Sequence, residues 1–438
     1  MKQSPLLLLL TLCPLASAQN ALNGPGILTS QPISGIGQRA GRDVDLRLYG
    51  YSQVVRDTGL IPYAVEKDGK LLQPGALTGV EVGLGAYGRH NFRRSTLGLD
   101  YSGNFRHYPS ATRYDGINQQ LNLSYSYQKS RRLQFDLTTT AGSQSFGPAG
   151  GAASNVTDLA VPGTALFFDN RVSFLQGGLD VRYALTGRTT MVVGGSFYTV
   201  HRQSSALVGV NGYNLQGQLQ HQLSRRTSIG ASFQHIHYDF PRAFGEADIN
   251  VYTGSWRTIL GRSFNLTLSG GVFASAVQGI QSSALDPDVA ALLGISTVQT
   301  IFYKENLLPT VTASLAKTFR RSQIVASYSR MVSPGNGLYL SSRSELISGG
   351  YSFTGTRRFS FSVDAGTSKL DSLGQNMPTY RQLIGTSTLN YKLGKGFNLA
   401  GSYSLRHHNF VANSLRRDSN RTAISLSFSP GDIPLSFR

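Results

Sequence analysis

The sequence has little of three things on which other protein classes depend: cysteine, long apolar runs and acidic residues. It contains 1 Cys among 438 residues, and because Cys13 lies in an N-terminal apolar segment, we expect the mature chain to hold no disulfide. Beyond that segment no run approaches the roughly 18 apolar residues of a spanning helix, which excludes a helical membrane protein. Asp and Glu number 23 against 41 Lys and Arg, a net charge of +18.

The N-terminus predicts a secretory signal over residues 1–18. Lys2 provides the positive end, Leu6 to Leu12 the apolar stretch, and Ala16 to Ala18 the small-residue cleavage site. Residues 19–43 are punctuated by Gly and Pro, and we expect a periplasmic lead-in too short to be the plug of an energy-coupled transporter. Residues 44–438 show no linker or change of period, so we expect them to form one domain.

Apolar and polar residues alternate in pairs of segments, each pair joined by a short turn and followed by a longer polar loop. The clearest pair runs through Leu121, Leu123, Tyr125 and Tyr127, turns at Lys129 to Arg132 and returns through Leu133, Phe135 and Leu137. A period of two predicts strands with one apolar and one polar face. Strands of roughly 10 residues, with turns short at one end and long at the other, are typical of a transmembrane antiparallel up-and-down β-barrel.

The alternation predicts an all-β barrel of about 18 strands, and 16 remain possible. The expected strands begin near Val44, Leu77, Ser95, Ile117, Leu133, Val172, Thr189, Gly212, Thr227, Ile249, Ser263, Leu308, Gln323, Ser344, Arg358, Arg381, Gly396 and Ser419. An open edge in hydrocarbon would leave backbone groups unsatisfied, so the sheet must close, and a wall of this size is too wide for side chains to fill. A soluble sandwich or propeller is the alternative.

Two outward loops are long. Gln144 to Asp169 is rich in Gly, Ala and Pro and is the third outward loop in chain order. Ala276 to Asn306 contains Asp286-Pro287 followed by an apolar run that ends at Gly294, a pattern that predicts a short helix.

The positive charge is concentrated in the short turns, which are free of Asp and Glu. These turns contain Arg89, Arg93, Arg94, Lys129, Arg131, Arg132, Arg188, Arg225, Arg226, Arg262, Arg320, Arg321, Arg357, Arg358, Lys392 and Lys395. Without these 16 and Lys2, 24 basic residues face 23 acidic ones, so walls and outer loops are close to neutral. We interpret the turns as a periplasmic rim that contacts anionic lipid headgroups or attracts an acidic solute. No groove-reading helix or basic aromatic platform indicates a nucleic-acid partner.

The strand parity predicts a lumen lined mostly by amide and hydroxyl side chains. The expected inward residues are Asn118, Gln120, Asn122, Ser124, Gln134, Thr138, Asn214, Gln216, Gln218, Gln220, Gln222, Ser232, Gln234, Ser360, Ser362, Asn398 and Ser402, with the charges Asp100, Asp136, Asp180, Arg182, Arg257, Asp364 and Arg406. An ion-selective pore is expected to concentrate charge of one sign at a constriction, and these strands do not. The Gln216 to Gln222 ladder can exchange hydrogen bonds with sugar hydroxyls, or it is an ordinary hydrated wall.

The histidines do not predict a metal or catalytic centre. His107, His201, His237 and His407 fall on the outward register at the external ends of strands, where an amphipathic ring suits the headgroup zone. A hydrolytic set needs its histidine and carboxylate together, and outward histidines cannot easily reach inward carboxylates. We expect no enzyme activity and no cofactor.

The signal, the alternating hairpins and the basic short turns together resemble outer-membrane β-barrel porins across nearly the whole chain. By size, strand number and neutral-polar lumen the chain looks like the porins associated with exopolysaccharide synthesis and export systems. In general porins the third outward loop narrows the channel, and Gln144 to Asp169 matches it by position. One departure is the C-terminus: the strand through Phe428 is followed by Pro430 to Arg438, with Phe437 penultimate where an aromatic residue commonly ends the chain.

The sequence therefore predicts a passive outer-membrane channel of a two-membrane bacterium, with carbohydrate as cargo, either oligosaccharide taken up or exopolysaccharide exported. The expected partners are outer-membrane lipid, a small hydrophilic solute or polysaccharide, and the barrel-insertion machinery. Two alternatives stay open: a structural or adhesive barrel with an occluded lumen, and an anion-preferring general porin. The sequence does not determine the oligomeric state.

Overall fold

The computed structural model describes most of the predicted barrel. The described residues are 46–59, 64–65, 71–72, 75–145, 171–204, 207–261, 263–284, 297–333, 340–354, 358–374, 379–410 and 415–433. The expected signal and lead-in, most of the third outward loop, the predicted helix from Asp286 to Gly294, and Arg262, Arg357 and Phe437 lie outside this range.

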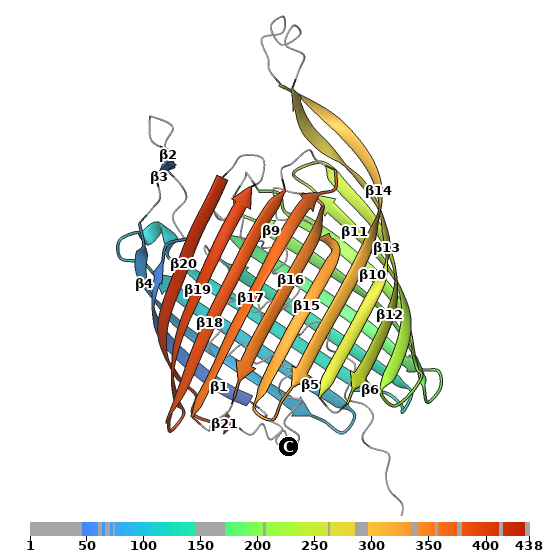
Figure 1. Cartoon of the computed structure of the whole chain (residues 1–438), viewed down its shortest axis with the longest axis horizontal. Helices are drawn as coiled ribbons and strands as arrows, with labels where there is room; N and C mark the ends of the chain where they lie inside the picture. Colours follow the sequence, from blue (N-terminus) through green and yellow to red (C-terminus); the bar gives the residue numbers. More distant parts are fainter. Residues whose placement is uncertain are drawn as a thin grey trace, which may run out of the picture.

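Eighteen antiparallel strands form one closed wall, which confirms the predicted fold and the higher strand number (Figure 1). The wall strands are β1 (Leu46–Asp57), β4 (Leu77–Asn91), β5 (Ser95–His107), β6 (Gly116–Gln128), β7 (Leu133–Gln144), β8 (Val172–Ala184), β9 (Thr189–Arg202), β10 (Val210–Gln222), β11 (Thr227–Phe240), β12 (Gly245–Leu260), β13 (Phe264–Ala284), β14 (Thr297–Thr318), β15 (Ser322–Ser333), β16 (Ser342–Phe353), β17 (Phe359–Ser372), β18 (Tyr380–Gly394), β19 (Phe397–Phe410) and β20 (Leu415–Phe428). Each strand pairs with its neighbours in sequence, and β1 closes the wall by pairing with β20.

Three short strands are additional to the eighteen wall strands. β2 (Ala64–Val65) and β3 (Leu71–Leu72) pair with each other between β1 and β4, and η2 (Thr112–Tyr114) is a single 3-10 turn between β5 and β6. β21 (Asp432–Ile433) follows β20 and pairs with Leu46 and Arg47 at the start of β1. The segment after the last wall strand therefore returns to the first one.

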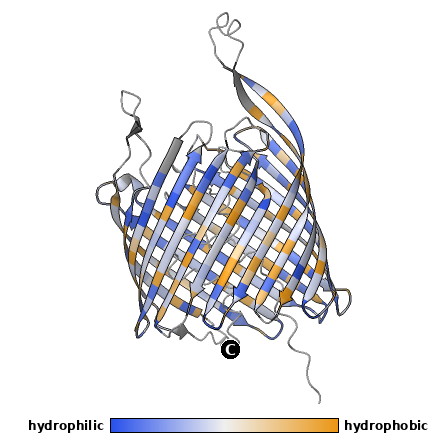
Figure 2. Ribbon diagram, in the orientation of Figure 1, coloured by the Kyte–Doolittle hydropathy of each residue, from blue (hydrophilic) through white to orange (hydrophobic). Residues whose placement is uncertain are grey.

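Hydrophobic and hydrophilic residues alternate along the wall strands (Figure 2), and successive side chains on a strand point to opposite faces. On β10, Leu215 and Leu219 are 54% and 46% exposed, whereas the amides between them belong to the other face. On β4, Val80, Val82 and Leu84 are exposed on the same outward side. Apolar side chains exposed all around a closed wall are the pattern of a surface in contact with lipid. Among the described residues no helix has the length and apolarity to cross a membrane.

A repeated backbone hydrogen bond links each short turn to the end of a strand beside the next short turn, so that the turns lie together at one end of the barrel. The carbonyl of the last residue of each short turn accepts a bond from an N–H within two residues of the end of the strand that leads into the next short turn. One example is Arg132 O, which accepts from Ala184 N at 2.8 Å. The accepting residues are Arg94, Arg132, Arg188, Arg226, Ser263, Arg321, Arg358 and Gly396. Six of these eight residues are arginines, so the sheet itself arranges the basic turns as a ring at one end of the barrel.

The prediction of a long loop from Ala276 to Asn306 was wrong. β13 and β14 are 21 and 22 residues long, and their pairing continues to Ala284 opposite Thr297. The two strands form a ribbon that rises beyond the outer rim (Figure 1). Small polar residues there mask the alternation, but two adjacent segments satisfy each other's backbone groups by pairing, and this decides where the strands end.

Candidate channel lumen

The inward face of the wall carries the residues that parity assigned to the lumen. Gln134 on β7 donates to Asp136 Oδ1 (2.7 Å) and to Ser126 Oγ (3.0 Å) on β6. Asn122 on β6 accepts bonds from Gln120 (3.3 Å) and from Thr140 on β7 (2.9 Å). The amides are thus partly paired with one another, which orients them along the wall. The remaining predicted lumen residues share this face: Asn118, Ser124, Thr138, Asp100, Asp180, Arg182, Asn214, Gln216, Gln218, Gln220, Gln222, Ser232, Gln234, Arg257, Ser360, Ser362, Asp364, Asn398, Ser402 and Arg406.

The glutamine ladder on β10 is braced by its neighbours. Gln220 donates to Ser228 Oγ on β11 (3.1 Å), and Gln216 donates to Asp180 Oδ1 on β8 (2.8 Å). The bond from Gln216 to Asp180 crosses β9 at Gly194, and Gly194 is the strand partner of both Gln216 and Asp180. A Cβ at Gly194 would lie 1.8 Å from Asp180 Oδ1, so the bond requires glycine at that position.

The expectation of a neutral-polar lumen fails in the outer half of the barrel. Many inward residues near the outer ends of β8 to β14 are apolar and buried, among them Ile249 and Phe273, both 0% exposed. Leu340 and Leu373, from the segments that precede β16 and follow β17, belong to the same cluster. A Cβ at Gly245 or Gly279 would lie within 3.2 Å of Leu340 Cδ1, so this side chain packs on strands β12 and β13. On the side of the barrel formed by β8 to β14, the lumen wall is therefore polar towards the short turns and apolar towards the outer rim.

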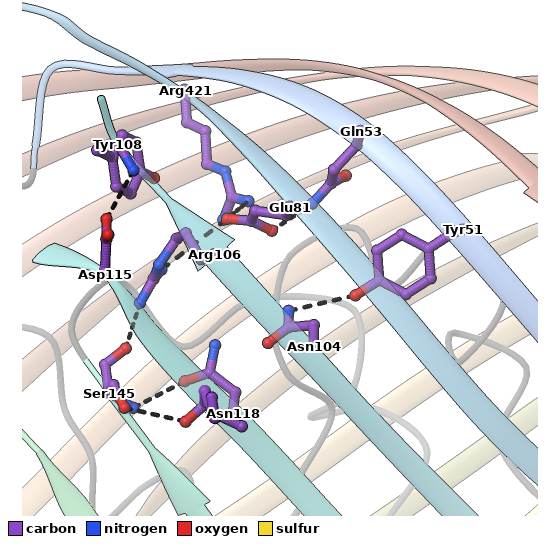
Figure 3. A network of polar contacts seen from close by, with 11 residues as sticks. Tyr51, Gln53, Glu81, Asn104, Arg106, Tyr108, Asp115, Asn118, Ser145 and Arg421 are labelled. Carbon is purple, nitrogen blue, oxygen red and sulfur yellow. Dashed lines mark hydrogen bonds and ion pairs between the residues drawn. The ribbon is translucent and has the colours of Figure 1, made fainter. Parts of the chain in front are cut away.

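The closure seam between the last and first strands carries a buried charged network that the sequence reasoning missed (Figure 3). Glu81 on β4 accepts a hydrogen bond from Arg421 Nη2 on β20 (2.9 Å), across β1, and lies 3.9 Å from Arg106 Nη1 on β5. Gln53 on the intervening strand also donates to Glu81. Their side chains are 3% (Glu81), 10% (Arg421) and 4% (Arg106) exposed. The carboxylate thus joins four strands.

The network continues to a predicted lumen residue. Arg106 also donates to the carbonyl of Ser145, whose N–H donates to Asn118 Oδ1 (2.7 Å). Asn104 donates to the hydroxyl of Tyr51 at 3.2 Å. The alternation of residues could have placed these charges on the inward face. Arg421 alternates with the outward apolar residues of β20, and Glu81 alternates with those of β4.

The short-turn end of the lumen contains a cavity of about 320 Å³ between the β6–β7, β8–β9 and β10–β11 turns. Its lining also includes inward residues of the wall strands, among them Gln134 on β7 and Gln220 and Gln222 on β10. The described lining holds no Asp or Glu but has seven arginines: Arg131, Arg132, Arg182, Arg188, Arg225, Arg226 and Arg257. Arg182 Nη2 lies 3.8 Å from Asp136 Oδ2. The other basic turn residues of the described range are outside this lining: Arg89, Arg93, Arg94, Lys129, Arg320, Arg321, Arg358, Lys392 and Lys395.

Three of the four outward histidines have carboxylate partners, which the sequence reasoning did not foresee. His237 pairs with Asp248 (2.8 Å), His407 with Asp418 (2.5 Å) and His107 with Asp115 (2.7 Å). Asp115 lies in an outer loop: slight desolvation raises its pKa, but hydrogen bonds from the Tyr108 N–H and from His107 outweigh this, and the net pKa is lowered. Within the described residues no group of three or more His, Cys, Asp or Glu can hold a metal ion.

Comparisons with known proteins return similar barrels only among solved structures. No protein-family model matches the chain, and no curated protein does. OccAB3 of Acinetobacter baumannii is 10% identical, with a TM-score of 0.39 over 88% of this chain and 99% of its own. OccK2 (OpdF) of Pseudomonas aeruginosa, solved with glucuronate, is 12% identical, with a TM-score of 0.41 over 88% and 98%.

The ferric-catecholate import receptor Fiu of E. coli K12 is 8% identical, with a TM-score of 0.44 over 89% of this chain and 82% of its own. At this level of similarity the comparisons assign neither a family nor a function to the chain.

Proposed function

We propose that the chain is a passive channel of a bacterial outer membrane and that its cargo is carbohydrate, either oligosaccharide entering or exopolysaccharide leaving the cell. The supporting observation is a closed wall of 18 strands with apolar side chains exposed outwards and amides and hydroxyls inwards. A barrel of that size encloses water when its inward face is polar. Outer-membrane lipid and the barrel-insertion machinery are the partners that this placement implies.

The neutral amide wall supports carbohydrate as the cargo. Gln216, Gln218, Gln220 and Gln222 follow one another on the inward face of β10 and carry both donors and acceptors. A sugar that moves along them exchanges hydrogen bonds to water for similar bonds to amides, at little net free energy per step. Two of the four already bond to neighbours, Gln216 to Asp180 and Gln220 to Ser228, which holds the row in place for this exchange.

A second candidate is a structural or adhesive barrel whose lumen is closed. The observation that favours it is the apolar cluster of the outer half, in which Leu340 packs on β12 and β13 and Phe302 lies against Gly374. Apolar contacts at one end of a lumen hinder the passage of hydrated solutes. The two candidates differ in whether solute crosses the barrel.

Conductance of the full chain in planar bilayers distinguishes them. A passive channel gives discrete conductance steps, and maltohexaose added to the bath reduces the open-channel current. The Gln218→Ala/Gln220→Ala variant removes amides from the ladder and is expected to weaken this block severalfold. Leu219→Ala, on the outward face of the same strand, is the matched control and should leave the block unchanged.

The Leu340→Ala/Phe302→Ala variant tests the outer closure. If the wild type is silent and this variant conducts, the lumen exists and the apolar cluster closes it. If both are silent although both are folded, the passive channel is excluded and the closed barrel stands.

A further inference from the structure

The arginine-lined cavity at the short-turn end is built by three consecutive turns of the same design. In each, a Ser or Thr hydroxyl accepts hydrogen bonds from the N–H groups of the residues two and three positions later. Ser130 accepts from Arg132 and Leu133 (3.2 and 3.1 Å), Thr186 from Arg188 and Thr189 (3.2 and 3.0 Å), and Ser224 from Arg226 and Thr227 (3.2 and 3.1 Å). Such hydroxyl-closed turns hold the backbone that carries the arginines in one conformation.

Backbone bonds also tie these turns together around the rim. Arg132 O accepts from Ala184 N beside the second turn, and Arg188 O accepts from Gln222 N beside the third, both at 2.8 Å. Arg226 O accepts from Ile259 N on β12 at 2.8 Å. The three turns are therefore parts of one sheet edge, which sets the spacing of the backbone positions that carry the arginines.

The cationic side chains of the described lining are all arginines. A guanidinium presents a planar fork that binds carboxylate or phosphate with two parallel hydrogen bonds, which an ammonium does not. No Asp or Glu belongs to the described lining, and Asp136, which is not part of it, lies 3.8 Å from Arg182. The cavity therefore keeps a strong positive charge.

Most strand residues of the cavity lining belong to the inward face of the wall. Its lining includes the inward residues Gln134, Arg182, Gln220 and Arg257, which share the face of the amide ladder. Two outward residues, Leu133 and Thr227, also belong to the lining, and each is the first residue of its strand beside a short turn.

The arginines come from separate turns, and this favours a ligand with several anionic groups. Neighbouring short turns are two strands apart, a separation of about 10 Å or more. A single carboxylate reaches the cations of one turn, whereas a chain of linked acidic sugars reaches those of two or three. The hydroxyls of such an oligosaccharide then contact Gln220 and Gln222, which also line the cavity.

We infer that this arginine-lined cavity binds the carboxylate- or phosphate-bearing residues of an acidic oligosaccharide at the periplasmic end of the channel. The inference rests on the proposed function, because it assumes carbohydrate in the lumen, and it narrows the cargo from neutral to acidic sugars. The arginines raise the local concentration of the oligosaccharide at this end of the lumen. The neutral glutamine ladder on β10 then exchanges weak hydrogen bonds with it, so that it moves along the lumen without being tightly bound.

Titration calorimetry on the detergent-solubilised full chain tests this without requiring conductance. The probes are hexagalacturonate, maltohexaose as its neutral counterpart, and inorganic phosphate. The wild type is expected to bind hexagalacturonate, with an affinity that falls as salt is added, and to bind maltohexaose and phosphate at least about tenfold more weakly. The Arg131→Gln/Arg188→Gln/Arg225→Gln variant, with one change in each turn of the cavity, is expected to lose about tenfold or more in affinity.

The matched control neutralises three rim arginines outside the cavity, Arg93→Gln/Arg320→Gln/Arg358→Gln, with the same change in net charge. It should retain wild-type affinity within about twofold. Equal losses in both triple variants would show general electrostatic attraction and overturn the proposal, as would equal binding of hexagalacturonate and maltohexaose.

A lipid outcome is distinguished by vesicles of phosphatidylglycerol. Retention of these vesicles that depends on the cavity arginines, without hexagalacturonate binding, would also overturn the proposal. A barrel that conducts but does not bind the hexauronate refutes this inference alone, whereas one that binds it but never conducts refutes the passive channel alone.

Discussion

Replacing Glu81 by Gln is expected to weaken the closure of the barrel more than any comparable change at an exposed ion pair. The substitution keeps the shape of the side chain but removes the charge between Arg421 and Arg106. Both guanidinium groups stay buried, with side chains 10% and 4% exposed. Because Glu81 bonds to β20 across β1, the loss falls on the seam where the two ends of the chain meet.

The expected loss in the free energy of unfolding follows from the burial of the ion pair. Removing one partner of a buried ion pair costs about 3–5 kcal/mol, since the remaining charge is left without compensation. Glu345, which lies 3.7 Å from Arg330 Nε, has a side chain that is 27% exposed, and its partner is 24% exposed. The pair lies on the outward face, three residues from the outer ends of β15 and β16, where water and headgroups screen charge, so Glu345→Gln is expected to cost about 1 kcal/mol or less. The two substitutions make the same chemical change and differ in burial.

Reversible guanidinium unfolding in lipid vesicles measures both, with the fluorescence of Trp256 on β12 as the signal. Glu81→Gln should lower the free energy of unfolding by at least about 2 kcal/mol more than Glu345→Gln. The double variant Glu81→Gln/Arg421→Gln should lose less than the sum of its single changes, because the two groups contact each other. Equal losses for Glu81→Gln and Glu345→Gln, or strict additivity in the cycle, would refute the account of the seam.

Two further predictions concern the lipid face and one turn. Leu215→Arg places a charge on the outward face near the middle of β10 and should cost about 2–4 kcal/mol in vesicle unfolding, whereas Gln216→Arg, one residue away on the inward face, should cost much less; similar costs would contradict the assigned faces. Gly396 has φ +87°, and a Cβ there would lie 2.3 Å from the Ser429 carbonyl oxygen, so Gly396→Ala should cost at least about 1–2 kcal/mol and lower the melting temperature. Gly187→Ala, where nothing lies within 4 Å of a Cβ, should leave the melting temperature nearly unchanged, and a comparable drop there would contradict the steric argument.

The strand number and the assignment of faces could be predicted because they depend on a local property. Successive side chains on a strand point to opposite faces whatever surrounds the strand, so Leu215 and Gln216 already indicate which face is apolar. The extent of β13 and β14 could not be predicted in this way. Their ribbon from Ala276 to Asn306 forms because two segments find each other as partners, and pairing is a property of two segments together.

The polarity of the lumen shows the same division. Parity puts Ile249 and Phe273 on the inward face as readily as Gln216, but a sequence does not say that Leu340 from an outer segment packs in the same cluster with them. The outward pairs, such as His237 with Asp248, were missed because the carboxylates considered were only those of the inward face.

The sequence by itself determined a period of two, turns of alternating length and a basic residue in nearly every short turn, since these are written in the order of neighbouring residues. Only the tertiary structure decided what the closed sheet brings together: Glu81 with Arg421, 340 residues apart, and the arginines of three turns around one cavity. The physical reason is that a side chain's face depends on its own strand, whereas its charge partners depend on which strands become neighbours when the barrel closes.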